Sequence, residues 1–126
     1  MIKTSSEHAA FQTVFASEHH QAIADAPMAK GGSGAGFDPH ELLEAALATC
    51  INIVVRKRAA QLNMAVESVA TTVRLDRSRP DVATFEYELD VRGPINDEQH
   101  TLLLDAVKTC PVSQTLLKRI EFRHAP

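Results

Sequence analysis

The segment from Leu42 to Val55 constrains the fold more than any other part of this sequence, because nearly all of its residues are apolar or small. Glu44 and Asn52 are the two exceptions. A helix on a protein surface shows polar residues on one face of every turn, and this segment does not. It therefore predicts a helix that is buried on nearly all sides, with Cys50 in its middle.

Capping residues mark the start of this helix. Asp38 is a favourable N-cap, Pro39 suits the first helical position because its missing N–H needs no partner there, and Glu41 can complete a capping box. A helix that continues to about Asn63 is roughly 37 Å long at about 1.5 Å per residue. This length exceeds the diameter expected for a small domain, so we expect a partner subunit to cover part of the helix.

Length and composition predict a single domain that spans residues 1–126 and buries about two thirds of its unfolded surface. The net charge is −3 and both signs are interspersed, which argues against binding of nucleic acid or an anionic membrane. The first 25 residues contain no apolar run typical of a signal peptide or membrane span. We therefore expect a cytoplasmic protein, in which two cysteines are more often thiols or a redox pair than a structural disulfide.

Apolar periodicity and turn signals predict an α+β fold. The expected elements, in order, are a hairpin within 11–26, the long helix, a hairpin of strands 66–75 and 82–91, a helix capped by Asn96 with apolar positions Leu102, Leu103, Ala106 and Val107, a short helix over 111–119, and a strand over 120–123.

The segment 30–36 holds four of the five glycines and superficially resembles a phosphate-binding loop. A P-loop has a lysine and a hydroxyl residue after its last glycine, whereas Phe37 and Asp38 stand here. The sequence thus disfavours phosphate binding. The histidines and cysteines also lack the spacing of a zinc site, so we expect no metal.

Cys50 and Cys110 are the candidates for chemistry. Cys110 precedes Pro111, so we expect it to be the N-cap of the third helix, where free N–H groups and the helix dipole lower a thiol pKa. Cys50 lies among apolar residues and by itself is expected to be an unreactive buried thiol. Position alone favours Cys110 as the reactive cysteine, although two unrelated core cysteines are the commoner case.

Segments 30–43, 48–50 and 109–114 resemble, in order and spacing, the two cysteine motifs of the OsmC/Ohr family, the osmotically inducible protein C-like and organic hydroperoxide resistance proteins. The similarity extends over about residues 21–124. It implies an OsmC-like fold, in which two small antiparallel sheets wrap around the long central helices of an intertwined homodimer. It also implies a peroxide-handling enzyme with its active site at the subunit interface.

The resemblance assigns a role to each cysteine. Cys50 is implied to be the peroxidatic thiolate, which attacks an organic hydroperoxide or hydrogen peroxide and becomes a sulfenic acid. Cys110 is implied to be the resolving thiol, which closes a disulfide that a dithiol reductant reopens. This chemistry needs no cofactor and is consistent with how thiols trap sulfenic acids. It reverses the assignment from position, and so requires a group outside the helix that stabilises the Cys50 thiolate.

In the peroxidases of the family that group is an arginine from the N-terminal strands, oriented by a glutamate near the start of the long helix. Glu41 is the nearest match to the glutamate. It precedes Cys50 by nine residues, so the two side chains face opposite sides of one helix and lie roughly 13.5 Å apart along it. Glu41 is thus either catalytic across the dimer or simply the capping-box glutamate.

The sequence contains no arginine before Arg56. His19, His20 and Lys30 are the candidates for the missing positive charge, although histidines in a hairpin turn are more often plain solvated residues.

Three hypotheses follow from the sequence. The first is an antioxidant thiol peroxidase of the oxidative stress response, acting through Cys50, Cys110 and Glu41. The second is a catalytically weak or inactive protein that binds a hydrophobic small molecule at the dimer interface, which the missing arginine favours. The third is a purely structural dimer, which does not need the paired cysteines. We adopt the first hypothesis.

Overall fold

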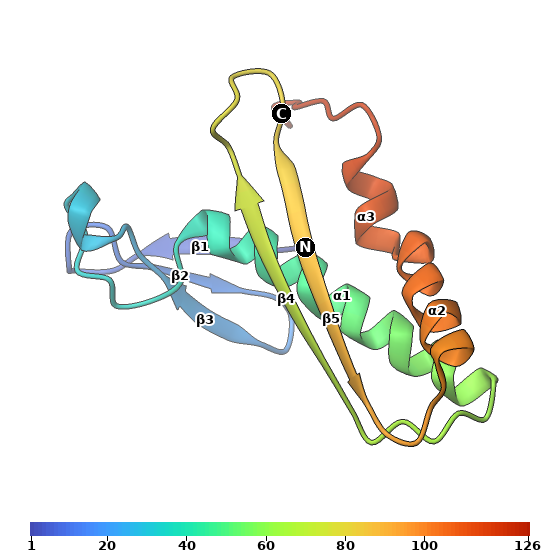
Figure 1. Ribbon diagram of the computed structural model, residues 1–126. Helices are drawn as coiled ribbons and strands as arrows, with labels where there is room; N and C mark the ends of the chain where they lie inside the picture. The colour runs from blue at the N-terminus through green and yellow to red at the C-terminus, as the bar shows by residue number, and fades with distance from the viewer. The chain divides into compact units, whose positions relative to one another are not determined.

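The computed structural model describes residues 1–126 and has the expected α+β class, with two small antiparallel sheets (Figure 1). The elements are β1 (Lys3–Ser6), β2 (Thr13–Ala16), β3 (Gln21–Ala24), the 3-10 helix η1 (Met28–Lys30), α1 (Pro39–Gln61), β4 (Ser68–Asp76), β5 (Thr84–Arg92), α2 (Asp97–Ala106), the 3-10 helix η2 (Val107–Thr109) and α3 (Pro111–Leu116). They fall into two compact units, Met1–Leu43 and Glu44–Pro126, which are described separately.

The first unit is built on the antiparallel sheet β1-β2-β3. The hairpin expected within 11–26 is confirmed as β2 and β3, which pair with Val14 opposite Ile23. β1 was not expected, because its sequence Lys-Thr-Ser-Ser shows no alternation of apolar and polar residues. All four of its side chains are exposed, so pairing with β2, rather than burial, holds this strand in place.

The glycine-rich segment of this unit folds around the carboxylate of Asp25, which is only 3% exposed. Asp25 Oδ2 accepts hydrogen bonds from the Ser33 hydroxyl at 2.7 Å and from the N–H groups of Ser33 and Ala35 at 3.2 and 3.1 Å. A Cβ on Gly32 would lie 1.8 Å from the carbonyl oxygen of Ala26, so only glycine fits there. A carboxylate of the chain itself therefore occupies the N–H groups that a phosphate would need.

The ends of α1 are capped locally. The N–H of Asp38 donates to the Glu41 carboxylate at 2.9 Å, and the Asp38 carboxylate accepts from the N–H of His40 at 2.8 Å. At the other end Asn63 adopts a left-handed φ of 52°, and the N–H groups of Asn63 and Met64 bond back to carbonyls of the last turn. This is a Schellman termination, and it ends α1 within two residues of the expected position.

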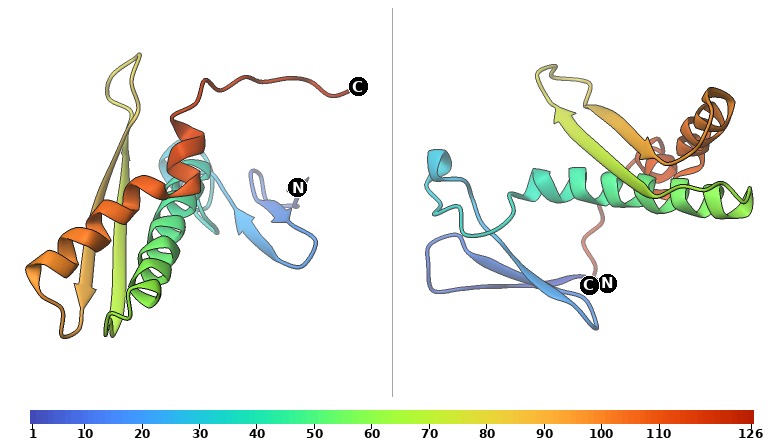
Figure 2. Two further views of the ribbon diagram at one scale, coloured as in Figure 1. Left: turned by 90° about the vertical axis from the view of Figure 1, so that its right-hand side faces the viewer. Right: turned by 60° about the horizontal axis from the view of Figure 1, so that its bottom comes forward.

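The second unit packs α1 and α2 against one face of the antiparallel hairpin β4–β5 (Figure 2). Both strands of this hairpin were expected from their alternation. The buried residues of the core come from α1, α2, η2 and the start of α3, and are Leu47, Ile51, Val55, Ala59, Leu103, Val107 and Cys110. Alternate strand residues, among them Val69, Val73, Phe85, Leu89 and Val91, pack against them.

The expectation that α1 is buried on nearly all sides is wrong for the single chain. Its buried residues recur every fourth position and form one stripe: Leu47, Ile51, Val55 and Ala59. The opposite side is open to solvent although it is mostly apolar, and we call it the exposed stripe, formed by Ala46, Thr49, Ile53 and Ala60. Ile53 is 46% exposed. One hairpin and one helix cover only half of a cylinder, so the apolar pattern exceeds what this chain alone can bury.

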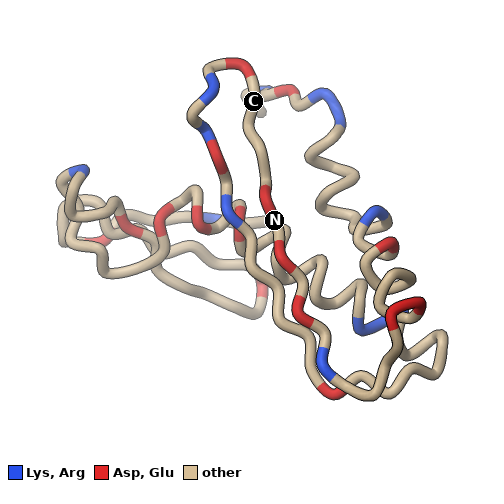
Figure 3. The backbone as a smooth tube through the Cα atoms, in the orientation of Figure 1, with Lys and Arg blue, Asp and Glu red and all other residues tan.

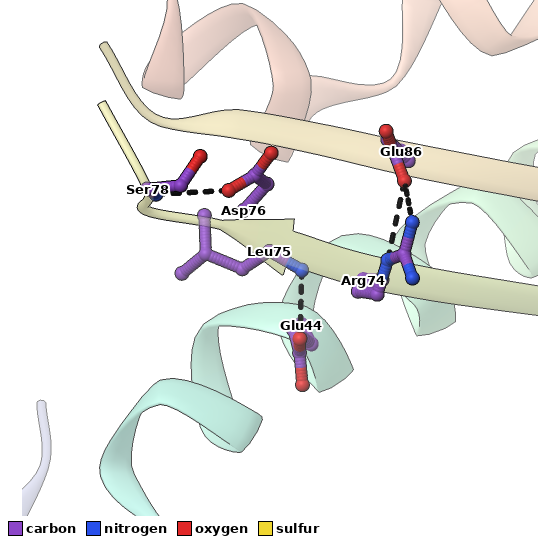
Figure 4. A network of polar contacts seen from close by, with 6 residues as sticks. All are labelled: Glu44, Arg74, Leu75, Asp76, Ser78 and Glu86. Atoms are coloured by element: carbon purple, nitrogen blue, oxygen red, sulfur yellow. Dashed lines mark hydrogen bonds and ion pairs between the residues drawn. The ribbon is translucent and has the colours of Figure 1, made fainter.

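The two polar exceptions of the apolar segment bind backbone groups of β4, and Figure 4 shows the contact made by Glu44. The Glu44 carboxylate accepts a hydrogen bond from the N–H of Leu75 at 2.7 Å, and the Asn52 amide donates to the carbonyl of Val69 at 2.8 Å. These backbone groups have no partner in β5, and leaving them unpaired next to a helix is costly. Glu44 and Asn52 therefore fix α1 against the hairpin.

The C-terminal residues depart from expectation. α3 ends at Leu116, and the strand expected over 120–123 does not form. Ile120 is 54% and Phe122 96% exposed. A strand needs an adjacent edge for its backbone groups, and no strand of this chain pairs with the segment. Leu102, expected on the buried side of α2, is 43% exposed, whereas its neighbour Leu103 is fully buried.

Charged residues of both signs are interspersed along much of the backbone, as Figure 3 shows. The polar outer face of the hairpin pairs some of them, for example Arg74 with Glu86. No helix has both the length and the apolar character to cross a membrane.

Candidate active site

The structure brings together the two cysteines, which are 60 positions apart in the sequence. Cys50 lies midway along α1, and Cys110 lies between η2 and α3. Both are free thiols in the same core cluster, where their side chains lie close enough for Cys50 to shift the pKa of Cys110. Cys110 is 0% exposed, whereas Cys50 is only partly buried. The pair is therefore asymmetric, with one accessible thiol and one enclosed thiol.

Position alone favoured Cys110 as the reactive thiol because a helix N-terminus lowers a thiol pKa, but the pKa of Cys110 shifts upward in the structure. Cys110 is the N-cap of α3, as expected, and the N–H groups of Ser113 and Val112 act to lower its pKa. Burial, however, raises the pKa of the Cys110 thiol, and the contact with Cys50 raises it further. Burial is the largest of these effects, so the net shift is upward.

A negative charge on Cys50 further raises the pKa of Cys110, so a thiolate at Cys50 favours the protonated form of Cys110. The pKa shift of Cys110 thus depends on its neighbour as well as on its burial.

Backbone hydrogen bonds hold Cys110 on both sides. Its N–H donates to the carbonyl of Val107 at 3.1 Å, and its carbonyl accepts from the N–H of Gln114 at 3.0 Å. Pro111 occupies the first helical position, where its lack of an N–H leaves nothing unpaired. The chain therefore changes direction at Cys110 without losing a backbone partner.

A groove of about 490 Å³ lies in this unit. It is lined by Val54, Lys57, Arg58, Gln61, Leu102, Asp105, Ala106 and Thr109. Neither cysteine is among these residues, but Val54 follows Cys50 by about one turn of α1 and Thr109 precedes Cys110 in the sequence. The lining combines apolar side chains with two cations, Lys57 and Arg58, that form no ion pair in the chain. The sequence analysis singled out neither cation, and only their spacing after Val54 hinted at a shared groove.

The other predicted site residues lie away from this pair in the sequence. Glu41 is in the first turn of α1, where its carboxylate accepts the capping hydrogen bond of Asp38. His19 and His20 lie in the turn between β2 and β3, and both are exposed. Lys30 ends η1 and is also exposed. None of these residues has a hydrogen bond to either cysteine.

The chain combines two small antiparallel sheets with a long helix that carries one of two adjacent thiols, so it is a small dithiol protein of the α+β class. The family profile described as OsmC-like protein matches residues 31–125, which is about three quarters of the chain. The chain therefore belongs to the OsmC-like protein family. A search of curated proteins finds no match.

Solved structures of OsmC and Ohr proteins share this fold. An OsmC-like protein from Mycoplasma pneumoniae superposes with a TM-score of 0.77 at 18% identity, covering 92% of this chain and 85% of its own. An organic hydroperoxide resistance protein OsmC from Legionella pneumophila gives 0.67 at 21% identity, with 93% and 88% covered. The organic hydroperoxide resistance protein OhrB of Bacillus subtilis gives 0.61 at 20% identity, with 93% and 89% covered. At these identities the likeness establishes the fold.

Proposed function

We propose that this protein is a thiol peroxidase that reduces organic hydroperoxides or hydrogen peroxide. The observation that carries the proposal is the neighbouring pair of free thiols, Cys50 and Cys110, with its difference in exposure. Only the accessible thiol can meet a peroxide, and only a neighbouring thiol can trap the product quickly. Membership of a family that includes hydroperoxide resistance proteins supports this reading.

The reaction begins at Cys50. Its thiolate attacks the distal oxygen of the peroxide, the O–O bond breaks, and the leaving alkoxide takes a proton and departs as the alcohol. Cys50 is left as a sulfenic acid. Cys110 then attacks the Cys50 sulfur, the S–O bond breaks, and water leaves as the disulfide forms. A dithiol reductant returns both thiols, so the cycle needs no cofactor and suits a reducing cytoplasm.

The working form is proposed to be a homodimer. The exposed stripe of α1 is apolar, and Ile53 at its centre is 46% exposed, which is typical of a surface that another chain covers. We expect α1 of a second subunit to pack on this stripe, because the stripe is long, consists mostly of small side chains and runs parallel to the helix axis. In such a dimer Glu41 of one subunit acts at the thiols of its partner.

The dimer is tested by Ile53→Glu, measured by analytical ultracentrifugation. A charge at the centre of an apolar interface is expected to weaken the dimer at least about ten-fold. Thr72→Glu adds the same charge on the exposed outer face of β4 and is expected to leave the dimer intact. A dimer unaffected by Ile53→Glu would place the interface elsewhere.

The peroxidase activity is tested by mass spectrometry of the reduced protein after a slight excess of cumene hydroperoxide, with remaining thiols alkylated. We expect a disulfide between Cys50 and Cys110 within seconds. Cys110→Ser is expected to stop at an oxidised Cys50, and Cys50→Ser is expected to consume no peroxide. Two free thiols in the wild-type protein after this treatment would contradict the proposal.

The groove that contains Val54 favours a second candidate, a protein that binds a hydrophobic small molecule. Its lining includes the apolar residues Val54, Leu102 and Ala106, and it is open to solvent. This function does not need the thiols, so Cys50→Ser is expected to retain binding of an apolar fluorescent probe such as ANS, whereas Ala106→Glu is expected to lose it.

A further inference from the structure

A hydrogen bond between side chain and backbone links α3 to η2, the two short helices on either side of Cys110. The Gln114 amide Nε2 donates to the carbonyl of Lys108 at 2.6 Å. A second bond, from the Thr109 hydroxyl to the carbonyl of Ala106 at 2.7 Å, ties η2 to α2. Gln114 is exposed and contributes nothing to the core, so its contact with η2 is what its side chain does in this structure.

We infer that Gln114 is a positioning residue for Cys110, which it holds against Cys50 so that the disulfide closes quickly. The inference deepens the proposed function and rests on it. Gln114 touches neither peroxide nor sulfur, and acts through the backbone of residues 108–110. No part of the sequence analysis singled it out, because its role depends on how the chain turns at Pro111.

Closure of a disulfide is sensitive to small displacements. For the disulfide to form, the two sulfurs must come to about 2.05 Å from each other, and the Cβ–S–S–Cβ dihedral must come near 90°. Cys110 sits at the join of two helices of three and six residues, which have little rigidity of their own. Because Pro111 donates no N–H, the Gln114 side chain supplies the tie from α3 back to Lys108. Without the Gln114 hydrogen bond, the segment between η2 and α3 samples positions in which Cys110 does not face Cys50.

The expected effect follows from the net free energy of one hydrogen bond. Losing that free energy lowers the population of the arrangement in which Cys110 faces Cys50, and therefore the rate of disulfide closure, by about two- to ten-fold. The attack of the Cys50 thiol on an external reagent needs no movement of α3, so its rate is expected to stay the same. The split between these two steps separates positioning from a general loss of structure.

The test uses the reduced full-length protein with one equivalent of 5,5′-dithiobis(2-nitrobenzoate), and needs no peroxide. Attack by the first thiol breaks the reagent disulfide and releases one thionitrobenzoate anion, leaving a mixed disulfide on the protein. Attack by the second thiol on that sulfur releases the second anion and closes the Cys50–Cys110 bond. Stopped-flow absorbance follows both releases, and rapid acid quench with mass spectrometry counts the mixed disulfide.

Two variants remove the donor. Gln114→Leu removes both polar atoms, and Gln114→Glu keeps the shape but places a carboxylate oxygen against the Lys108 carbonyl. Thr115→Val is the matched control, because the Thr115 hydroxyl bonds within α3 to the carbonyl of Pro111 at 2.9 Å and does not reach η2. We expect both Gln114 variants to slow the second release about two- to ten-fold and the control to match the wild type.

Two results would overturn the inference: closure at the wild-type rate in both Gln114 variants, or an equal slowing in Thr115→Val. Its failure is distinct from that of the proposed function. A wild-type protein that closes its disulfide with this reagent but not with cumene hydroperoxide would contradict the peroxidase and leave the positioning result standing.

Discussion

Two enclosed ionisable groups, Asp25 in the first unit and Cys110 in the second, have pKa values shifted in opposite directions. Asp25 is 3% exposed, yet its pKa is lowered, chiefly by the hydrogen bond from the Ser33 hydroxyl and then by the N–H of Ala35. Cys110 is 0% exposed and its pKa is raised, chiefly by burial. Three donors meet at Asp25 Oδ2, although Oδ1 has none.

The contrast shows that donors, and not burial alone, decide whether an enclosed group carries charge. Backbone N–H groups of the glycine-rich loop donate hydrogen bonds to the Asp25 carboxylate, and these bonds fix the loop. The thiol site offers Cys110 two N–H groups, which do not offset the combined effect of burial and the neighbouring Cys50. A permanently charged group suits structure, whereas a thiol that keeps its proton until its neighbour is oxidised suits a reaction sequence.

The largest expected effect separates chemistry from structure at the thiol site. Cys50→Ser is expected to lower the peroxide reduction rate by more than about 1000-fold, because a hydroxyl is neither ionised nor nucleophilic enough at neutral pH. Its melting temperature is expected to change little, since serine fills nearly the same volume at a partly buried position. A coupled assay with cumene hydroperoxide and dithiothreitol measures the rate, and circular dichroism measures the melting. Retained turnover would show that Cys50 is not the nucleophile.

Substitution of Asp25 is expected to lower the stability of the protein and to leave its thiol chemistry unchanged. Asp25→Asn keeps the shape but weakens three hydrogen bonds to a charged acceptor, so the melting temperature is expected to fall by several degrees at pH 7. Ser33→Ala is the smaller companion change, because it removes only the hydroxyl donor. Full thiol reactivity in Asp25→Asn, measured with the same disulfide reagent, would complete the contrast.

The pH dependence of Asp25 has a definite sign. Its pKa in the folded protein is below the ordinary aspartate value of about 3.9. The stabilisation by the ionised form is therefore complete above about pH 3.9 and is lost as the pH falls through the lower folded pKa. The difference in melting temperature between wild type and Asp25→Asn is expected to be constant from neutral pH to about pH 4 and to shrink below it. A difference that already shrinks at pH 6 would mean that the carboxylate is not held by these donors.

The parts of this fold that depend on neighbours in sequence were predictable, and those that depend on tertiary contacts were not. The Asp38–Glu41 cap spans three residues, and each strand of β4–β5 shows its own alternation. The bond from Glu44 to Leu75 joins residues 31 apart, so the sequence marks Glu44 only as an exception in an apolar segment. The C-terminal strand failed for the same reason, because its alternation is local but its pairing partner is not.

In the candidate site, too, the local features were predictable and the tertiary ones were not. The motifs identified both cysteines, and Pro111 correctly placed Cys110 at a helix start. The direction of its pKa shift was missed, because burial and the contact with Cys50 arise only when α1 meets η2 and α3. A pattern of residues predicts which donors a helix end provides, but it does not report how deeply the sulfur is enclosed.

The smallest expected effect tests the two causes of the Cys110 shift separately. Cys50→Ala removes the neighbouring sulfur and its charge but leaves Cys110 enclosed, so the pKa of Cys110 is expected to fall part of the way toward the ordinary cysteine value. The measurement is the pH dependence of iodoacetamide alkylation at Cys110, followed by mass spectrometry. Wild type is expected to have the higher midpoint, and Cys50→Ala one that still lies above that of a free cysteine peptide. An unchanged midpoint would assign the whole shift to burial, and the contribution of Cys50 to it would then be wrong. A midpoint equal to that of the peptide would instead make Cys50 the sole cause of the Cys110 shift and remove the contrast with Asp25.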